Sequence, residues 1–466
     1  MNFKWLGVFL MLPACGGPSA TEPVKESETS PPASLETIER LPDLMDAFGV
    51  SGVAVTVVSG DEILVSEGFG VTQDGDDFSS STSCGLFSAT KVLASLTYAN
   101  LANDGRLDLN APLGNYIDDA PAAWQDIPFY RLLNHTSGIT MAVNKEAFGA
   151  IASDPSSQNK DIYEMVSALP LDFEPGAASR YRQSGYAIAE MILKDRLGES
   201  FDTLVEQYIA APAGLRNTKH PAVSEDQGAA ILLSAGGYKT TVEDMAQMFL
   251  SLNDGTIIAP EAWRSFLETQ DYRFGDYSIG SVFAQNGTTV TVGHSGGGAR
   301  ANIRYAPSEK IGVMACTDDR SNKGLARSLA RMLVSEVSSG EAPLVPLLVA
   351  LADYETQTGA AVVDAFAAAK AQTDVYDLSD AEALLNSIGY SFLASERVAD
   401  AIVVFEANSK AYPESPNTYD SLGEALLASG DRDGALANYR QVLALDPDNA
   451  NASAMVDKIL SETPEQ

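Results

Sequence analysis

A serine and a lysine stand three residues apart at the start of a helical pattern, in the run Ser88-Ala89-Thr90-Lys91. Residues i and i+3 share one face of a helix, so this lysine would accept the serine proton if burial lowers its pKa. Ser88 would also open the helix, where free backbone N–H groups favour a developing oxyanion. The pair therefore predicts nucleophilic catalysis with Ser88 as the nucleophile.

Three other matches to catalytic motifs are set aside. Ser157 and Lys160 have the same spacing, but they follow a polar stretch with no apolar helix behind it, so we expect a loop there. Residues 98–100 read Tyr-x-Asn, a motif that must lie on a different element from the lysine and form a separate wall of the site. They lie on the same predicted helix as Lys91, so they cannot form that wall. Residues 293–297 read Gly-x-Ser-x-Gly, the nucleophile elbow of α/β-hydrolases, which needs a histidine after the serine. The histidines are His135, His220 and His294, none of them after that serine.

The elements that would position Ser88 alternate between helical and strand patterns over residues 35–338. Apolar residues at helical spacing run over 88–103, and two apolar runs around residues 59–61 predict a hairpin over 50–70. Further helices are expected at 186–197 and 201–209. Strands are expected at 277–283, 288–292, 303–305 and 311–316. Strands at both ends with helices between them predict an α+β fold, an antiparallel sheet flanked by helices.

Six segments of this region resemble, in the same order, the motifs of the serine β-lactamase and penicillin-binding superfamily, in its class C-like and esterase branch. The segments are 87–91 (FSATK), 103–109 (NDGRLDL), 131–139 (RLLNHTSGI), 181–186 (YRQSGY), 236–245 (GGYKTTVEDM) and 293–297 (GHSGG). The resemblance covers roughly residues 37–338. It implies a β-lactamase-like serine hydrolase domain, and an ordered series of motifs is more specific than any one of them.

The resemblance also implies a role for each matched residue. Ser88 would attack a carbonyl and form an acyl-enzyme, while Lys91 and Tyr181 share the proton transfers, either of them being the acylation base. Backbone N–H groups of Ser88 and Gly297 would hold the oxyanion, at about 3 kcal/mol per donor. The expected catalytic residues are Ser88, Lys91, Tyr181 and His294, and the expected oxyanion and substrate-binding residues are Gln183, Ser295, Gly296 and Gly297. His135 is interpreted as part of the scaffold.

The chain departs from this family pattern at two positions. His294 stands where many relatives have lysine, and an imidazole attracts a substrate carboxylate less strongly, which favours esters or peptide-like amides over β-lactams. Arg300 would supply the missing cation, although a solvated arginine is the commoner reading. Gln183 replaces an asparagine, which adds a methylene group and a rotatable bond. Activity would then be reduced, redirected or lost, unless Gln183 compensates locally.

Behind this region, the chain after residue 341 is rich in Ala and Leu and carries a repeat of 34 residues. Gly389, Leu393, Ala401, Phe405 and Pro413 recur as Gly423, Leu427, Ala435, Tyr439 and Pro447. The period and the small residues resemble tetratricopeptide repeats. We expect an all-α domain over 341–463, with clear repeats at 382–415 and 416–449, a degenerate helical pair at 344–369 and a capping helix at 451–460. Two repeats are marginal alone, so flanking helices or docking on the first domain would complete the core.

The first residues read as a targeting signal. Lys4, a short apolar run and Leu12-Pro13-Ala14-Cys15 resemble a bacterial lipoprotein signal over residues 1–15, with Cys15 as the lipidated residue. Residues 16–36 read as a disordered tether. The chain would then be an exported lipoprotein of the bacterial cell envelope, facing the periplasm or the exterior and held by its lipid alone. The alternative is an ordinary cleaved signal.

Composition excludes several other classes of function. The formal net charge of −33 repels polyanions, so a nucleic-acid partner is not expected. Three histidines and three cysteines without paired spacing predict no metal site, and no motif predicts a cofactor. Cys84 and Cys316 would form a disulfide or remain as buried thiols, and the sequence does not decide between them.

Two hypotheses from different classes remain at this point. The first is a serine hydrolase acting on a small ester or peptide-like amide, of esterase, D-aminopeptidase, carboxypeptidase or β-lactamase type, whose repeats recruit a protein or peptide partner. The second is a catalytically impaired envelope lipoprotein, altered at Gln183, that acts as a binding module through its repeats. The retention of Ser88, Lys91, Tyr181 and His294 favours the hydrolase.

Overall fold

The computed structural model describes residues 35–141, 149–151, 153–224, 229–298, 300–317, 324–341 and 343–461. The predicted signal (1–15) and almost all of the predicted tether (16–36) lie outside these ranges, and helix α1 begins at Glu36. Within the described ranges, every helix is too short or too polar to cross a bilayer.

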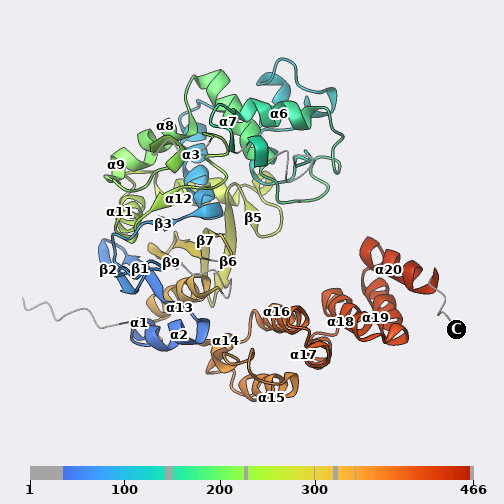
Figure 1. The fold of residues 1–466 in the computed structure, drawn as a ribbon. Helices are drawn as coiled ribbons and strands as arrows, with labels where there is room; N and C mark the ends of the chain where they lie inside the picture. The colour runs from blue at the N-terminus through green and yellow to red at the C-terminus, as the bar shows by residue number, and fades with distance from the viewer. Residues whose placement is uncertain are drawn as a thin grey trace, which may run out of the picture. The chain divides into compact units, whose positions relative to one another are not determined.

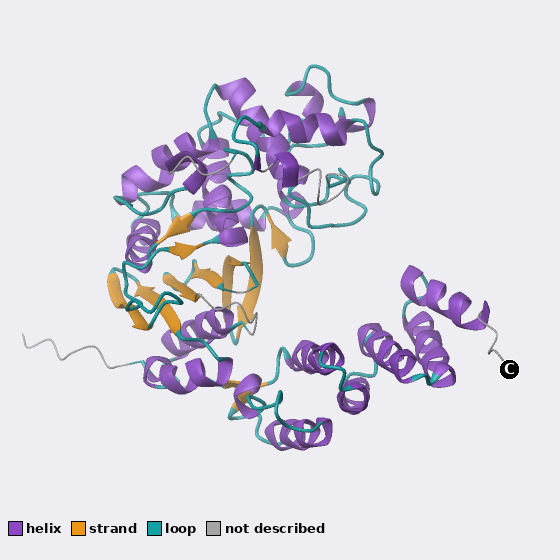
Figure 2. Cartoon of the chain, in the orientation of Figure 1, coloured by secondary structure: helices purple, strands orange, loops and turns teal. Residues whose placement is uncertain are grey.

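A seven-stranded sheet forms the centre of the first domain, in the order β2-β1-β9-β8-β7-β6-β5, and each pair of neighbouring strands is antiparallel (Figure 2). The strands are β1 (Gly52–Ser59), β2 (Glu62–Gly70), β5 (Tyr277–Ser278), β6 (Ser281–Asn286), β7 (Thr289–Gly296), β8 (Ala301–Ala306) and β9 (Ile311–Thr317). The predicted hairpin is β1–β2. The first and last parts of the domain therefore meet in one sheet, which confirms the predicted α+β fold.

The side chains of the central strands pack into two separate cores, because successive side chains of a strand alternate between the two faces of the sheet. In β1, Ala54 and Val58 join one apolar cluster, whereas Val53, Val55 and Val57 join the other. Figure 1 shows the helices on each side. The first face is covered by α3 (Lys91–Asn103), α11 (Val242–Asn253) and α12 (Pro260–Glu268), and the second by α1 (Glu36–Glu39), α2 (Leu41–Phe48) and α13 (Leu325–Ser339).

The remaining elements of the domain lie on the side of the first core, where the candidate site residues also lie. They are the short pair β3 (Cys84–Gly85) and β4 (Lys239–Thr240), and the helices α4 (Tyr130–Leu133), α6 (Asn159–Ser167), α7 (Ser184–Leu197), α8 (Phe201–Val205), α9 (Ala211–Ala213) and α10 (Pro221–Ser224).

Several local predictions need correction. The helix expected over 201–209 becomes a π-helix at Glu206–Ala210. The strand expected over 277–283 is instead a hairpin of β5 and β6, in which Ser278 pairs with Ser281 and Gly280 lies in the turn with a φ of +65°. A Cβ at Gly280 would lie 2.3 Å from the carbonyl oxygen of Lys91, so the turn also needs glycine there. The loop expected at Ser157 and Lys160 is only half right, because α6 begins at Asn159 and includes Lys160.

The tail is helical, as predicted, apart from one pair of two-residue strands. Its helices are α14 (Leu347–Ala350), α15 (Gly359–Lys370), α16 (Ala381–Ala394), α17 (Val398–Ala411), α18 (Pro416–Ser429), α19 (Arg432–Leu445) and α20 (Ala450–Ser461), with a short parallel pair of β10 (Val345–Pro346) and β11 (Tyr376–Asp377). Gly389 of α16 faces the ring of Phe405 in α17, and Gly423 of α18 faces Tyr439 in α19. Small residues thus allow close helix pairs at the repeated positions, while the domain boundaries and the tetratricopeptide assignment stay predictions.

The first tail helices share the second core with the sheet. Leu347, Phe366 and Leu385 belong to the same apolar cluster as Val55 of β1. Arg331 of α13 also pairs with Asp377 and Asp380 of the tail. The paired helices are therefore completed partly by contact with the first domain, one of the two routes expected for so short a repeat array.

Candidate active site

Ser88 lies in a single 3-10 turn, Phe87–Thr90, directly before α3. The turn is anchored from outside: the Leu86 N–H donates to the carbonyl of Tyr238 at 2.7 Å, and the Tyr238 N–H donates to Thr90 Oγ1 at 3.3 Å. Phe87 has a left-handed backbone with φ +47°, which is uncommon for a bulky residue. The half-buried nucleophile candidate thus stands on a backbone held by several contacts, immediately before the expected helix rather than within it.

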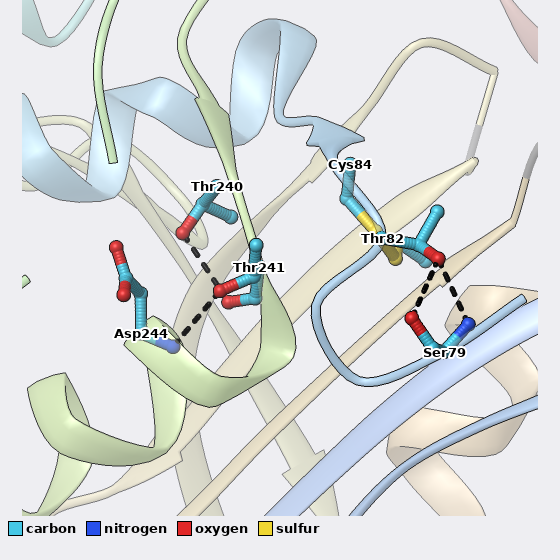
Figure 3. The surroundings of a disulfide bond; sticks show 7 residues. Ser79, Thr82, Cys84, Thr240, Thr241 and Asp244 are labelled. Carbon is cyan, nitrogen blue, oxygen red and sulfur yellow. Dashed lines mark hydrogen bonds between the residues drawn. A yellow bond between two sulfur atoms is a disulfide. The ribbon is translucent and has the colours of Figure 1, made fainter. Parts of the chain in front are cut away.

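A disulfide reinforces this anchoring. Cys84 and Cys316 are bonded, with their Cα atoms 6.2 Å apart, so the alternative left open by the sequence is decided in favour of the bridge. Figure 3 shows the bridge beside two hydrogen-bonded turns, one between Ser79 and Thr82 and one in which Thr241 caps α11. The bridge therefore ties β3, shortly before Ser88, to the central strand β9.

Lys91 is completely buried in the first turn of α3. Its Nζ donates hydrogen bonds to Gln183 Oε1 at 3.0 Å and to the carbonyl oxygen of Ala235 at 2.5 Å, and it lies 4.8 Å from the ring centroid of Tyr181. Burial lowers the pKa of Lys91 from 10.5 to about 7, and the negative charge of Glu190 opposes that shift. A substantial fraction of the lysine is therefore a neutral amine at neutral pH, the form that accepts a proton.

Tyr181 connects the other members of the group. Its hydroxyl is hydrogen-bonded to the side chains of Ser88 and Gln183. Burial raises the pKa of Tyr181, and these two hydrogen bonds lower it, although 43% of the residue is exposed. The phenol is therefore neutral near pH 7, and it stands next to the serine hydroxyl whose proton must move.

His135 supports the segment that carries Tyr181. Its ring Nδ1 accepts from the Arg182 N–H at 3.3 Å, its carbonyl accepts from the Arg180 N–H at 3.0 Å, and its Nε2 lies 3.1 Å from the Tyr277 hydroxyl. The ring centroids of His135 and Tyr181 are 4.4 Å apart. Burial is the main cause that lowers the pKa of His135 well below 6.5. A neutral, fully bonded histidine fits the scaffold role expected from the sequence.

Strand β7 forms the opposite wall. Gly296 lies against the Ser88 turn so closely that a Cβ there would be 2.0 Å from the carbonyl oxygen of Leu86. The hydroxyl of Ser295 accepts a hydrogen bond from Asn302 Nδ2 at 2.7 Å, so it is partly occupied by the neighbouring strand. Only glycine at position 296 permits this approach, which explains the glycines at the end of the motif.

His294 is 8% exposed, and burial lowers its pKa to about 4, with the charge of Lys91 as the next cause. Its Nδ1 lies 2.6 Å from the carbonyl oxygen of Ser295, so the neutral ring carries its proton on Nδ1. Nε2 is buried and has no hydrogen-bond partner among the described residues. The ring therefore offers a free acceptor and no positive charge at neutral pH.

Two backbone N–H groups belong to the elements that face each other here, one in the Ser88 turn and one in the residue that follows β7. Within the described chain, the N–H groups of Ser88 and Gly297 donate to no backbone carbonyl. Gly297, with φ +54°, packs on the ring of Phe87. The guanidinium carbon of Arg300 lies 4.2 Å from the centroid of the same ring, and Arg300 Nε donates to the carbonyl of Gly297. The arrangement leaves two donors for a developing oxyanion.

The structure thus brings together Ser88, Lys91, Tyr181, Gln183 and the β7 residues His294, Ser295, Gly296 and Gly297. Cys15 lies outside the described residues. Tyr98 is completely buried within α3, as expected for a letter match that belongs to the core of that helix. The sequence reasoning missed Glu190 and the Ala235 carbonyl, both of which act on Lys91.

Known proteins match this chain at the level of family and fold. The beta-lactamase family model matches residues 38–335, which is more than half of the chain. The protein PbpX of Bacillus subtilis (strain 168) is 25% identical over 224 residues, covering 46% of this chain and 54% of its own length. The D-alanyl-D-alanine-carboxypeptidase/endopeptidase AmpH of Escherichia coli (strain K12) is 24% identical over 223 residues, covering 45% and 55%. The chain spans about half the length of the curated relatives it matches.

Solved structures share the same fold. The octameric penicillin-binding protein homologue from Pyrococcus abyssi superposes with a TM-score of 0.56 at 20% identity, over 66% of this chain and 78% of its own. The D-amino acid amidase from Ochrobactrum anthropi SV3 gives a TM-score of 0.53 at 19% identity, over 65% and 100%. Because the family model matches more than half of its residues, the chain belongs to the beta-lactamase family, the group of β-lactamase-related serine hydrolases that its motifs resemble.

Proposed function

We propose that this chain is a serine hydrolase that forms an acyl-enzyme at Ser88 and hydrolyses a small ester or peptide-like amide. The observation that carries the proposal is the state of Lys91. A completely buried lysine with a pKa of about 7, bonded to Gln183 and beside Tyr181, is costly for the fold and useful for accepting a proton.

In the first step, Ser88 Oγ attacks the substrate carbonyl, and its proton passes to the Tyr181–Lys91 pair. Tyr181 contacts the serine, but its raised pKa disfavours the phenolate, so the neutral amine of Lys91 is the better final acceptor. The protonated lysine then returns a proton to the leaving group. Water attacks the acyl-enzyme with the same groups acting in reverse.

Charge that develops on the carbonyl oxygen would be stabilised by the N–H groups of Ser88 and Gly297. Each is a backbone donor fixed by its turn, so no reorganisation is needed as the charge appears. We expect each donor to contribute about 3 kcal/mol to the stabilisation of the transition state.

The β7 wall favours an uncharged group on the substrate next to His294. With its pKa near 4, His294 supplies no cation for a substrate carboxylate, while its free Nε2 would accept a hydrogen bond from an N–H or O–H. The amidase and the carboxypeptidase among the similar proteins are named for cleaving amide bonds. The first point supports an ester or a peptide-like amide with no carboxylate beside His294, and the second supports the cleavage of amide bonds in general.

Gln183 argues against the catalytically impaired alternative. The longer side chain still reaches Lys91 Nζ at 3.0 Å and also hydrogen-bonds Tyr181. The contacts expected of the amide are therefore made, which supports a working site.

We also propose that the protein is an exported envelope lipoprotein attached through Cys15, with a tetratricopeptide-type tail that binds a protein or peptide partner. The Cys84–Cys316 bridge supports an oxidising compartment, where such bonds persist. The regular helix pairs α16–α17 and α18–α19 support the repeat assignment.

The test is intact-mass analysis of the detergent-solubilised chain after incubation with a fluorophosphonate, a penicillin and a panel of nitrophenyl esters. We expect one adduct per chain, lost in Ser88→Ala and retained in Ser157→Ala, which alters the other serine of this spacing. The reagent that labels fastest identifies the preferred substrate class. A folded protein that forms no adduct with any reagent would contradict the hydrolase proposal.

A further inference from the structure

A buried acid faces Lys91 from α7, and the proposed mechanism does not use it. Glu190 follows Gln183 by seven residues, a spacing that puts both side chains on one face of a helix. Glu190 is only 4% exposed. Burying a carboxylate is unfavourable unless it is hydrogen-bonded, so the partners of Glu190 indicate its role.

The hydrogen bonds of Glu190 all fix one short segment, residues 232–234, either directly or through Asn159. Glu190 Oε1 accepts from the N–H of Ser234 at 2.6 Å and from its hydroxyl, while Oε2 accepts from the N–H of Leu233 at 3.1 Å and from Asn159 Nδ2 at 2.8 Å. Asn159 in turn accepts the N–H of Leu232 at 3.0 Å. Three consecutive backbone N–H groups, from 232 to 234, therefore end on the Glu190–Asn159 pair.

The segment needs this support because it belongs to no helix or strand. Leu232 has a left-handed backbone with φ +54°, which is unfavourable for a bulky residue. The next residue after the bonded N–H groups is Ala235, whose carbonyl oxygen accepts from Lys91 Nζ at 2.5 Å. The carboxylate of Glu190 thus bonds to Ser234, the residue directly before Ala235, and Ala235 is a direct partner of Lys91.

We propose, building on the proposed hydrolase function, that Glu190 is a positioning residue: it fixes the segment of residues 232–234 so that the Ala235 carbonyl holds Lys91 against Gln183. The two contacts of Lys91 Nζ then both depend on α7 and on Gln183, the residue that directly precedes it. Gln183 binds the lysine directly, and Glu190 binds it through the segment. Loss of Glu190 would leave Lys91 with one fixed partner.

The charge of Glu190 gives this role a second consequence. The titratable groups that face Lys91 are His135, Tyr181, Tyr186 and His294, and Tyr277 packs on His135 behind them. The titratable groups near Glu190 are Tyr98, Tyr238, Lys160, Lys194 and Asp195. Burial raises the pKa of these buried tyrosines and lowers the pKa of His135 and His294, so they are uncharged near neutrality. Glu190 alone raises the pKa of Lys91. Its removal should lower that pKa.

The experiment measures the rate of fluorophosphonate labelling of Ser88 from pH 5 to 9 in the detergent-solubilised full chain. In the wild type the rate should rise through about pH 7, as Lys91 loses its proton. Glu190→Gln removes the charge and misplaces the donors, so the midpoint should fall by about one pH unit and the plateau by about tenfold to a hundredfold. Glu190→Asp keeps the charge but shortens the reach, so the plateau should fall with the midpoint unchanged.

Glu164→Gln is the matched control, because Glu164 is an exposed acid on α6 whose ion pair with Lys160 lies at the surface. Its profile should equal that of the wild type. Folded Glu190→Gln and Glu190→Asp proteins with wild-type midpoint and plateau would overturn the inference. A wild type that is never labelled would overturn the hydrolase proposal itself, which distinguishes the two failures.

A third variant covers the case in which Glu190→Gln does not fold. Ser234→Ala removes one hydroxyl donor to Glu190 and leaves both backbone N–H donors in place. Its plateau should fall by a few-fold, less than that of Glu190→Asp. An unchanged plateau in folded Ser234→Ala, together with an unchanged plateau in Glu190→Asp, would contradict the proposed positioning.

Discussion

Around Ser88 the buried side chains include ionisable groups, whereas in the described part of the tail the buried polar side chains are neutral. Lys91, Glu190 and His294 are all less than a tenth exposed. The buried polar residues of the tail are Asn408, Ser409, Thr418 and Ser421. Burying charge costs free energy that an apolar core does not cost. The first region therefore accepts a stability cost that its chemistry can explain, and the second is built for packing.

The two regions also differ in how far their contacts reach along the chain. Lys91 bonds to residues 92 and 144 positions away, and Glu190 bonds to Ser234 across 44 positions. In the tail, Gly389 and Phe405 meet between consecutive helices, and the same contact recurs one repeat later. Changes in the first region should therefore alter chemistry more than stability, and changes in the second should do the reverse.

The largest effect is expected for Lys91→Met, which should lower the rate of Ser88 labelling by about 10²- to 10⁴-fold, the usual contribution of a proton-transfer group. Methionine removes the cost of burying an amine but leaves the Ala235 carbonyl without its donor. The free energy of unfolding should therefore change by less than about 2 kcal/mol. Labelling kinetics and urea unfolding measure the two quantities on the same protein.

Lys160→Met is the matched control, because Lys160 belongs to the other Ser-x-x-Lys run and is exposed on α6. It should leave both the labelling rate and the stability unchanged. Labelling of Lys91→Met at the wild-type rate would show that the buried lysine is not the proton acceptor. The proposal that changes near Ser88 alter chemistry more than stability would then be wrong.

The long reach of these contacts explains what the sequence could and could not predict. The order of the motifs predicts Ser88, Lys91 and Tyr181 as candidate catalytic residues, because each motif is short and typical of the family. Glu190 was missed, since an acid on a helix resembles a solvated residue until its distant partners are known. A signal was present: Ala187 and Leu193, three residues before and after Glu190 on the same face of the helix, are apolar, so that face is not a polar one.

Other elements could also be predicted from the sequence where their contacts are local, and could not where their contacts come from distant parts of the chain. The 34-residue repeat predicts α16 to α19 because the contacts that form each pair lie between neighbouring helices. The turn at Gly280 that divides the strand expected over 277–283 had a local signal, the glycine itself, whereas the close approach of the Lys91 carbonyl to Gly280 had none. A backbone carbonyl such as that of Ala235 has no sequence signature at all.

The next largest effect concerns the bridge that ties the two ends of the first domain. Replacing both cysteines, Cys84→Ser with Cys316→Ser, should lower the free energy of unfolding by about 2–5 kcal/mol, because the bridge closes a loop across 232 positions and restricts the unfolded chain. Urea unfolding of the variant against the oxidised wild type measures the difference. The reduced wild type is the control and should resemble the variant. Equal unfolding midpoints for all three proteins would show that the bridge is energetically neutral.

The smallest effect compares two glycines at the same repeat position. In Gly389→Ala the new Cβ would lie 2.5 Å from two atoms of the Phe405 ring, whereas in Gly423→Ala it would lie 3.1 Å from the Tyr439 ring. Alanine is favoured over glycine in a helix by about 0.5–1 kcal/mol, and overpacking costs about 1–3 kcal/mol. Gly389→Ala should therefore lower the free energy of unfolding by about 1–2 kcal/mol, while at Gly423 the two effects nearly cancel.

Thermal unfolding of the two variants measures this difference, with each serving as the control for the other. The labelling rate of Ser88 should be unchanged in both, because neither glycine contacts the site. Gly389 packs in the core that the tail shares with the sheet, whereas Tyr439 belongs to a separate cluster of the last helices. A slower labelling rate in Gly389→Ala alone would mean that the shared core transmits packing changes to the candidate site, and the proposed separation of the two regions would then be wrong at that core.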